Sequence, residues 1–161
     1  MFNLKAEFYL KIIFLFSFIA LISAFFIEYI LGHQPCNLCL IERIPYGLSI
    51  MIIMAIFLIK KNQKFLVMLL ILTFIFSFAI SFYHFGIEQG FFQESSVCGV
   101  KSSTEIVTKE DLLKQLSEKT ISCKDVTFRI FGLSLTSINI VISILFIITL
   151  LKIFKENEKN K

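Results

Sequence analysis

Two cysteine pairs are the residues of this sequence whose type and spacing best suit a chemical reaction. Cys36 and Cys39 are separated by two residues, a spacing at which two sulfur atoms can close a small disulfide ring. Arg43 follows Cys39 by four residues, which on a helix is one turn along the same face. A helix N-terminus and a nearby fixed positive charge both favour the thiolate form of a cysteine. The motif therefore predicts a reactive thiolate.

The second pair, Cys98 and Cys123, is widely spaced in the sequence. On its own, such a pair is equally consistent with a structural disulfide, which the chain-entropy model credits with ~3 to 4 kcal/mol of stability. Two pairs in one chain, however, can exchange a dithiol for a disulfide and so move two electrons between them. We therefore favour a redox relay over a structural staple.

The elements that must position these cysteines are membrane-spanning helices. The chain has 161 residues, of which 57% are hydrophobic and only 17% charged, a balance that a water-soluble domain of this size could not bury. A span requires about 20 apolar residues. We expect one integral membrane domain over residues 1–161, an all-α antiparallel bundle of four transmembrane helices. The expected spans are residues 10–31, 44–59, 65–85 and 130–154, and the second, which is short, is allowed to begin near Glu42 and Arg43.

Lysines in the connections predict the orientation. Lys60, Lys61 and Lys64 lie between the second and third spans, and the C-terminal tail carries four more lysines, which places both segments in the cytoplasm. The external loops are then residues 32–43 and 86–129, and they contain all four cysteines. In a bacterial-type envelope, this would be a multi-pass protein of the inner membrane with cytoplasmic termini and with its cysteines in the periplasm, where disulfides persist. The net charge of +4 thus indicates topology, and no basic patch suggests nucleic-acid binding.

A short amphipathic helix is predicted in the second external loop. Thr108 is a typical N-cap, Glu110 and Asp111 would occupy the first turn, and leucines follow from Leu112 at helical spacing. Such a helix either packs on its own loop or lies in the membrane surface.

A relay also needs an electron acceptor. The sequence has no haem-attachment motif, no dinucleotide fingerprint and no iron–sulfur spacing, so a lipid-soluble quinone, ubiquinone or menaquinone, remains. Its carbonyl oxygens require an apolar slot with a cation or hydrogen-bond donor. Arg43 and His84 are the candidates for that contact, and Glu88, one turn after His84, could orient the imidazole. His84 is also consistent with a histidine that only anchors a helix end at the membrane interface, and Arg43 with an equivalent anchor.

Three motifs resemble the disulfide bond formation protein B (DsbB) family, membrane quinone reductases that reoxidise a periplasmic thiol oxidase. They are residues 34–43 (QPCNLCLIER), residues 83–90 (YHFGIEQG), and residues 122–125 (SCKD) followed by 131–135 (FGLSL). The resemblance extends from the first span to the last. The vitamin K epoxide reductase family also combines four cysteines with a quinone, but there the loop pair precedes the CxxC motif.

The resemblance implies a role for each cysteine. Cys98 would form a mixed disulfide with a periplasmic thioredoxin-fold partner of the DsbA type, and Cys123 would resolve it. Cys36 and Cys39 would pass the electrons to the membrane quinone pool, with Cys39 facing the quinone ring and no metal involved. The protein would then be an oxidoreductase that makes a disulfide in its partner while it reduces a quinone. Lys124 departs from similar chains, which often carry an acid after the loop cysteine, and this bears on partner docking.

Two other classes of protein stay open. One is a non-enzymatic envelope membrane protein with two structural disulfides. The other is a membrane metal-binding protein with a zinc site made of His33, Cys36, Cys39 and His84. The zinc site is the weaker alternative, because structural zinc sites usually have two short paired spacings.

Overall fold

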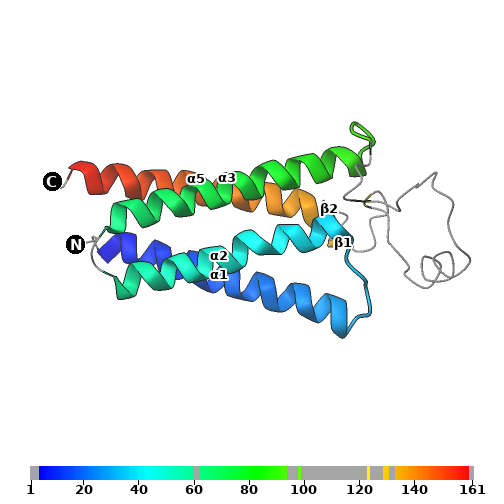
Figure 1. Ribbon diagram of the computed structural model, residues 1–161, viewed down its shortest axis with the longest axis horizontal. Coiled ribbons are helices and arrows are strands. Elements are labelled where there is room, and N and C mark those ends of the chain that lie inside the picture. The colour runs from blue at the N-terminus through cyan, green and yellow to red at the C-terminus, as the bar shows by residue number, and fades with distance from the viewer. Residues whose placement is uncertain are drawn as a thin grey trace, which may run out of the picture.

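The protein is a bundle of four long helices (Figure 1). The computed structural model describes residues 4–59, 62–93, 98, 123, 129–130 and 133–159. In this part of the chain each of the four helices is long and apolar enough to cross a membrane, so the predicted all-α membrane bundle is confirmed. With the labels of Figure 1, the helices are α1 (Leu4–Tyr29), α2 (Asn37–Leu58), α3 (Gln63–Glu88) and α5 (Leu135–Lys159).

Helix α2 begins earlier than the sequence predicted. It starts at Asn37, not near Glu42, because Cys36 caps it: the Cys36 sulfur accepts a hydrogen bond of 3.3 Å from the backbone N–H of Cys39. Pro45 lies inside the helix, where it removes one backbone hydrogen bond without ending the helix. The segment expected as an external link, residues 32–43, therefore contributes its second half to α2.

Helix α5 begins later than the predicted fourth span. Two short strands, β1 (Arg129–Ile130) and β2 (Leu133–Ser134), pair antiparallel, and the helix starts directly after β2. The amphipathic helix predicted after Thr108 lies outside the described residues.

The four helices run side by side along one axis, with both chain ends at one end of the bundle and the strand pair at the other (Figure 1). Helix α3 packs against α2 and α5, and α1 packs against α2. Helix α1 makes only slight contact with α5. The bundle is therefore closed on three sides and loosely closed on the fourth.

Apolar packing and a few hydroxyl pairs hold the helices together. Phe74 of α3 is fully buried and lies at the centre, edge to face against an aromatic side chain of α5. Ser49 donates a hydrogen bond of 3.0 Å to Ser17, joining α2 to α1, and Ser143 donates one of 3.2 Å to Ser77, joining α5 to α3. Such contacts are needed because lipid gives helices no hydrophobic drive to associate.

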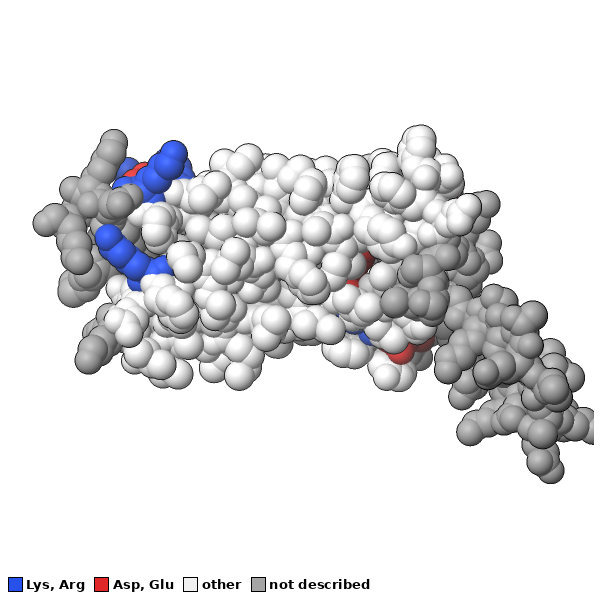
Figure 2. Space-filling view, turned by 45° about the horizontal axis from the view of Figure 1, so that its top comes forward, with Lys and Arg blue, Asp and Glu red and all other residues white. Residues whose placement is uncertain are grey.

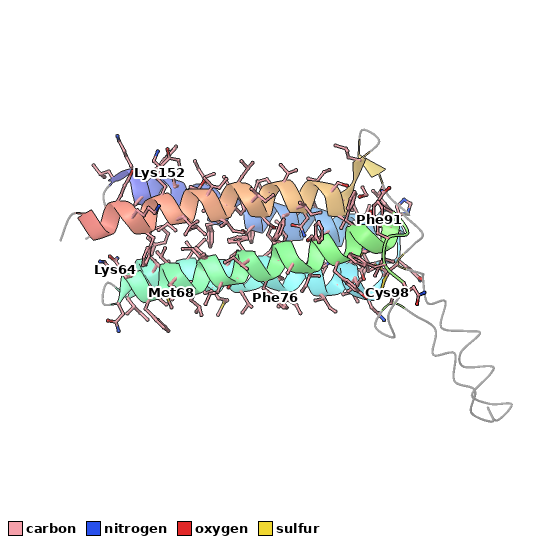
Figure 3. The ribbon with its side chains drawn as sticks, turned by 90° about the horizontal axis from the view of Figure 1, so that it is seen from above. Lys64, Met68, Phe76, Phe91, Cys98 and Lys152 are labelled. Atoms are coloured by element: carbon pink, nitrogen blue, oxygen red, sulfur yellow. A yellow bond between two sulfur atoms is a disulfide. The ribbon has the colours of Figure 1, made fainter. Side chains whose placement is uncertain are left out.

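Charged side chains gather at the two ends of the bundle. Figure 2 shows mostly basic side chains at one end, a wide uncharged band, and acidic side chains with some basic ones toward the other end. In Figure 3, Lys64 and Lys152 lie at the first end and Cys98 at the second. The described lysines and the cysteines thus occupy opposite ends, as their division between segments predicted.

Helix α3 ends in a turn that folds Phe92 back onto the helix. The backbone N–H groups of Phe91 and Phe92 donate to the carbonyl of Gly86 at 2.8 and 3.1 Å, and Gly90 has a φ of +78° that favours glycine. The Phe92 ring stacks on Tyr83 at 5.7 Å between centroids. A Cβ on Gly86 would lie 2.1 Å from this ring, so the close approach depends on glycine.

Candidate active site

All four cysteines meet at the end of the bundle away from the chain termini. Cys98 and Cys123 form a disulfide, with their Cα atoms 5.4 Å apart. Both are buried in one apolar cluster with Cys36, against which Cys39 also packs. Cys36 and Cys39 are free thiols with their sulfur atoms 2.9 Å apart. The fold therefore brings together a disulfide and a dithiol that the sequence separates widely.

Cys36 sits in an environment that favours its thiolate. The hydrogen bond with Cys39 lowers the pKa of the Cys36 thiol to about 4, against the effect of burial, and the hydrogen bond with His84 acts in the same direction. The Nε2 atom of His84 lies 3.6 Å from the Cys36 sulfur, and its Nδ1 atom lies 2.9 Å from Oε1 of Glu42. His84 is only 2% exposed. A carboxylate thus orients the imidazole that faces the sulfur.

Glu42 connects this imidazole to a buried polar network. Its second oxygen accepts a hydrogen bond of 3.2 Å from Asn139 of α5, which also donates to Ser81 at 2.7 Å. The hydroxyl of Tyr46 donates to the side-chain oxygen of Asn139. Sequence reasoning assigned no role to Glu42 or Asn139. The available signal was their polarity inside or beside an apolar span, where polar residues are costly and usually functional.

Glu88 is close to His84 but does not orient it in the predicted way. The Nδ1 atom of His84 already contacts Glu42. Oε1 of Glu88 lies 3.9 Å from the other ring nitrogen, Nε2, on the side that faces the cysteines. Thr136 donates a hydrogen bond of 2.5 Å to Oε1. The Glu88 side chain is only 5% exposed, and its Oε2 atom is buried without a hydrogen-bond partner among the described residues. Glu88 therefore presents an unpartnered carboxylate oxygen in the interior.

Arg43 points toward α1 and forms an ion pair that the sequence did not predict. Its guanidinium donates to Glu28, lies 3.5 Å from the backbone oxygen of Ala24, and sits over the ring of Phe25 at 5.3 Å. The charge predicted to act on Cys39 is thus largely compensated by Glu28. An acidic residue within the first apolar segment was the signal for this partner.

A cavity of about 340 Å³ opens between α1, α2 and α5, where α1 and α5 barely touch. Its polar wall includes Cys39, Glu42, Arg43 and Tyr46. Cys36, His84 and Glu88 are not among the residues that line it. A quinone contact of His84, one of the two candidates from the sequence, stays a prediction. The remaining wall is mostly apolar and includes Phe16, Ala20, Ala24, Ile27, Ile138 and Ile142.

Three of the four zinc ligands considered from the sequence also come together. The ligand atoms of Cys36, Cys39 and His84 all lie within 4.8 Å of one another. His33, the fourth, lies in the cavity wall and not in this group.

Comparison with known proteins agrees with the site. The family model described as "Disulfide bond formation protein DsbB" matches residues 6–153. The chain is also 32% identical over 147 residues to the uncharacterized protein RP370 of Rickettsia prowazekii (strain Madrid E), covering 90% of this chain and 86% of that protein. The chain therefore belongs to the DsbB family, whose membership implies a membrane oxidoreductase that acts on thiols and forms disulfides.

Proposed function

We propose that this protein is a thiol:quinone oxidoreductase of the bacterial inner membrane that reoxidises a periplasmic thioredoxin-fold thiol oxidase of the DsbA type. The observation that carries the proposal is the position of the Cys36/Cys39 pair between two different partners. On one side it packs with the Cys98–Cys123 disulfide, and on the other Cys39 lines an apolar cavity.

Electrons enter at the Cys98–Cys123 disulfide. A thiolate of the partner attacks Cys98, Cys123 leaves as a thiolate, and the second thiol of the partner releases Cys98, so that the partner gains a disulfide and this chain a dithiol. That dithiol then reduces a Cys36–Cys39 disulfide by the same exchange. The shared burial of the two pairs supports this transfer, because exchange requires the sulfur atoms to meet.

Electrons leave through Cys39 toward the cavity. A quinone bound there accepts two electrons and two protons as Cys36 and Cys39 return to a disulfide. The wall supplies the apolar surface that such a ring needs, and Arg43 supplies a donor for a carbonyl oxygen. The slight contact between α1 and α5 supports entry of the quinone from the lipid.

Protons follow a different route from the electrons. His84 faces Cys36 and holds the proton that a thiol loses, while Glu42 contacts His84 and also lines the cavity. We assign Glu42 the transfer of that proton to the cavity. His84 and Glu88 then serve the cysteine pair, not the quinone directly.

The proposed orientation places both termini in the cytoplasm and the cysteines in the periplasm. It rests on the described lysines at one end of the bundle and the cysteines at the other (Figure 3). An impermeant thiol reagent should label the reduced protein in intact spheroplasts.

Quinone reduction by the purified protein, with a reduced thioredoxin-fold protein as electron donor, tests the proposal. We expect turnover that stops when Cys98 and Cys123 are replaced by alanine. A membrane protein with two structural disulfides would instead lose stability in reductant and never reduce the quinone.

A further inference from the structure

We propose that the reduced site is also a metal site: Cys36, Cys39, His84 and Glu88 bind one tetrahedral divalent cation of the Zn²⁺ class. The cation would occupy the dithiol state alone, since a disulfide has no thiolate to offer. Binding stands apart from the proposed function. Its consequence, a block on reoxidation of the pair, rests on that function.

The distances between the ligand atoms suit tetrahedral coordination. With Zn–S near 2.3 Å and Zn–N near 2.05 Å, the ligands of a tetrahedral site lie about 3.6 Å apart for sulfur and nitrogen and about 3.8 Å apart for two sulfurs. The Cys36 sulfur and His84 Nε2 are 3.6 Å apart. The two sulfurs are 2.9 Å apart, so they must open by somewhat less than 1 Å, which small rotations of the Cys39 side chain allow.

Glu88 would supply the fourth ligand after its side chain turns toward the sulfurs, since it lies outside the group of three whose ligand atoms are all within 4.8 Å of one another. Its Oε1 lies 3.9 Å from His84 Nε2 and accepts from Thr136, while Oε2 is buried without a hydrogen-bond partner in the part of the chain that the structure describes. An unpartnered buried carboxylate oxygen is costly. A cation between Glu88 and the two sulfurs would satisfy it.

The other nitrogen of His84 is held as it is in known zinc sites. Metal-bound histidines almost always donate their second N–H to a carboxylate or carbonyl, which fixes the tautomer and the ring orientation. Here Glu42 Oε1 lies 2.9 Å from Nδ1 and leaves Nε2 for the metal. The chain therefore contains the ligand set together with the group that orients it.

The consequence is competition between the metal and the oxidant for the same thiolates. A bound cation engages a lone pair on each sulfur, which lowers the nucleophilicity of both thiolates and opposes the loss of their electrons. Free zinc would then hold the pair in its reduced form.

Co²⁺ binding to the full chain with Cys98 and Cys123 replaced by alanine tests the site, because these replacements remove the other thiols. We expect the reduced protein to bind one Co²⁺ per chain, with the visible bands of tetrahedral cobalt and charge-transfer bands from two thiolates. Oxidation with diamide or prior alkylation should abolish these bands. Zn²⁺ should displace the cobalt.

Four variants separate the ligands from the surroundings. His84→Ala should remove the tetrahedral spectrum, Glu88→Gln should weaken binding and change the spectrum, and Glu42→Gln should lower affinity by roughly 10-fold to 100-fold as the orienting group. His33→Gln, in the cavity wall, is the matched control and should bind as the parent does. Binding that survives oxidation or alkylation, or that needs His33 and not Glu88, would overturn the site.

The competition is measured separately, in the wild-type enzyme. Zn²⁺ should slow quinone reduction, and Glu88→Gln should require at least 10-fold more zinc for the same inhibition. Cobalt binding with turnover that zinc leaves unchanged would overturn the competition. No turnover even without metal would instead refute the proposed function and leave the cobalt result standing.

Discussion

Cys36 and Cys39 are three residues apart, yet they face different parts of the molecule. Cys36 is 6% exposed, packs with the loop disulfide and contacts His84, whereas Cys39 is half-buried and lines the cavity. The backbone explains the difference, because Cys36 is the N-cap with an extended conformation and Cys39 is in the first helical turn. The comparison teaches that a short CxxC motif can have one sulfur that faces the loop disulfide and one that faces a cavity.

Replacing either cysteine should have the largest effect on activity. It also tests whether Cys36 and Cys39 have different partners. Cys36→Ser and Cys39→Ser should both abolish quinone reduction. Only Cys39→Ser should accumulate a disulfide between Cys36 and a loop cysteine, since Cys36 shares their buried cluster. Non-reducing gels with peptide mapping identify the linkage. A disulfide between Cys39 and a loop cysteine in Cys36→Ser would instead show that Cys39 is the sulfur that meets the loop.

Glu42→Gln should separate proton transfer from quinone binding. Because Glu42 contacts both His84 and the cavity, its loss as a general acid–base should lower kcat by roughly 100-fold and change KM little. Steady-state quinone titration measures both constants. A raised KM with unchanged kcat would make Glu42 a quinone contact.

Arg43 tests the Cys39 side of the comparison. Removing a charge-assisted hydrogen bond worth ~1.5 to 3 kcal/mol should raise the quinone KM of Arg43→Ala by roughly 10-fold to 100-fold. Arg43→Lys should fall between, because lysine keeps the charge and loses the fork geometry. Glu28→Gln should have a smaller effect, since it only loosens the guanidinium. Equal KM values in all four proteins would leave Arg43 as an anchor of α2.

The pH dependence of alkylation tests the Cys36 side. With a pKa of about 4, the thiolate of Cys36 is present throughout pH 5.5 to 7.5, so its alkylation rate should change little in this range. For an ordinary thiol, with a pKa of ~8.5, the alkylation rate would fall by roughly 100-fold as the pH is lowered through this range. In Cys39→Ala, the alkylation rate of Cys36 should again depend on pH, because the hydrogen bond with Cys39 is the main cause of the lowered pKa of Cys36. Cys98 and Cys123 are replaced by alanine in both proteins.

The same shift predicts how the stability of the reduced protein depends on pH. Because folding lowers the pKa, the thiolate stabilises the fold fully above ~8.5, and the contribution declines as the pH falls toward about 4. Thermal unfolding of the reduced protein at several pH values should follow this direction. The oxidised protein is the control and should lack this component.

Replacing Gly86 by alanine should have the smallest effect of these changes, and it acts on stability. The same replacement at Gly47 is the matched control. An alanine at Gly86 would meet the Phe92 ring and should lower stability by about 1 to 3 kcal/mol as that ring is displaced. At Gly47, inside α2, nothing lies within 4 Å of an added Cβ, so alanine should be neutral or stabilise by up to about 1 kcal/mol. Thermal unfolding in detergent compares them. Equal melting temperatures would show that Phe92 swings away freely.

Much of the fold follows from the sequence, because lipid constrains it strongly. Apolar length predicts the four helices, and lysine placement predicts the division between the two ends. Helix boundaries were harder: the sulfur cap of Cys36 extended α2, and the strand pair delayed α5. Neither effect depends on hydropathy.

The site was predictable in its cysteines and less so in its partners. Spacing indicated Cys36 and Cys39, but the partners of Arg43 and His84 come from other helices, and no local pattern gives a contact across the bundle. Glu28 reaches Arg43 from α1, and Asn139 reaches Glu42 from α5. Only packing decides these pairs.

The hydrogen bond from the backbone of Cys39 to the Cys36 sulfur also bears on the reduction potential of the pair. A thiolate is a better acceptor for that bond than a disulfide sulfur, so capping α2 stabilises the reduced form. A pair whose reduced form is stabilised is a stronger oxidant. If the cap is worth ~0.5 to 2 kcal/mol, it raises the potential by roughly 10 to 40 mV. The hydrogen bond that begins a transmembrane helix thus also helps to set the reduction potential of the cysteine pair.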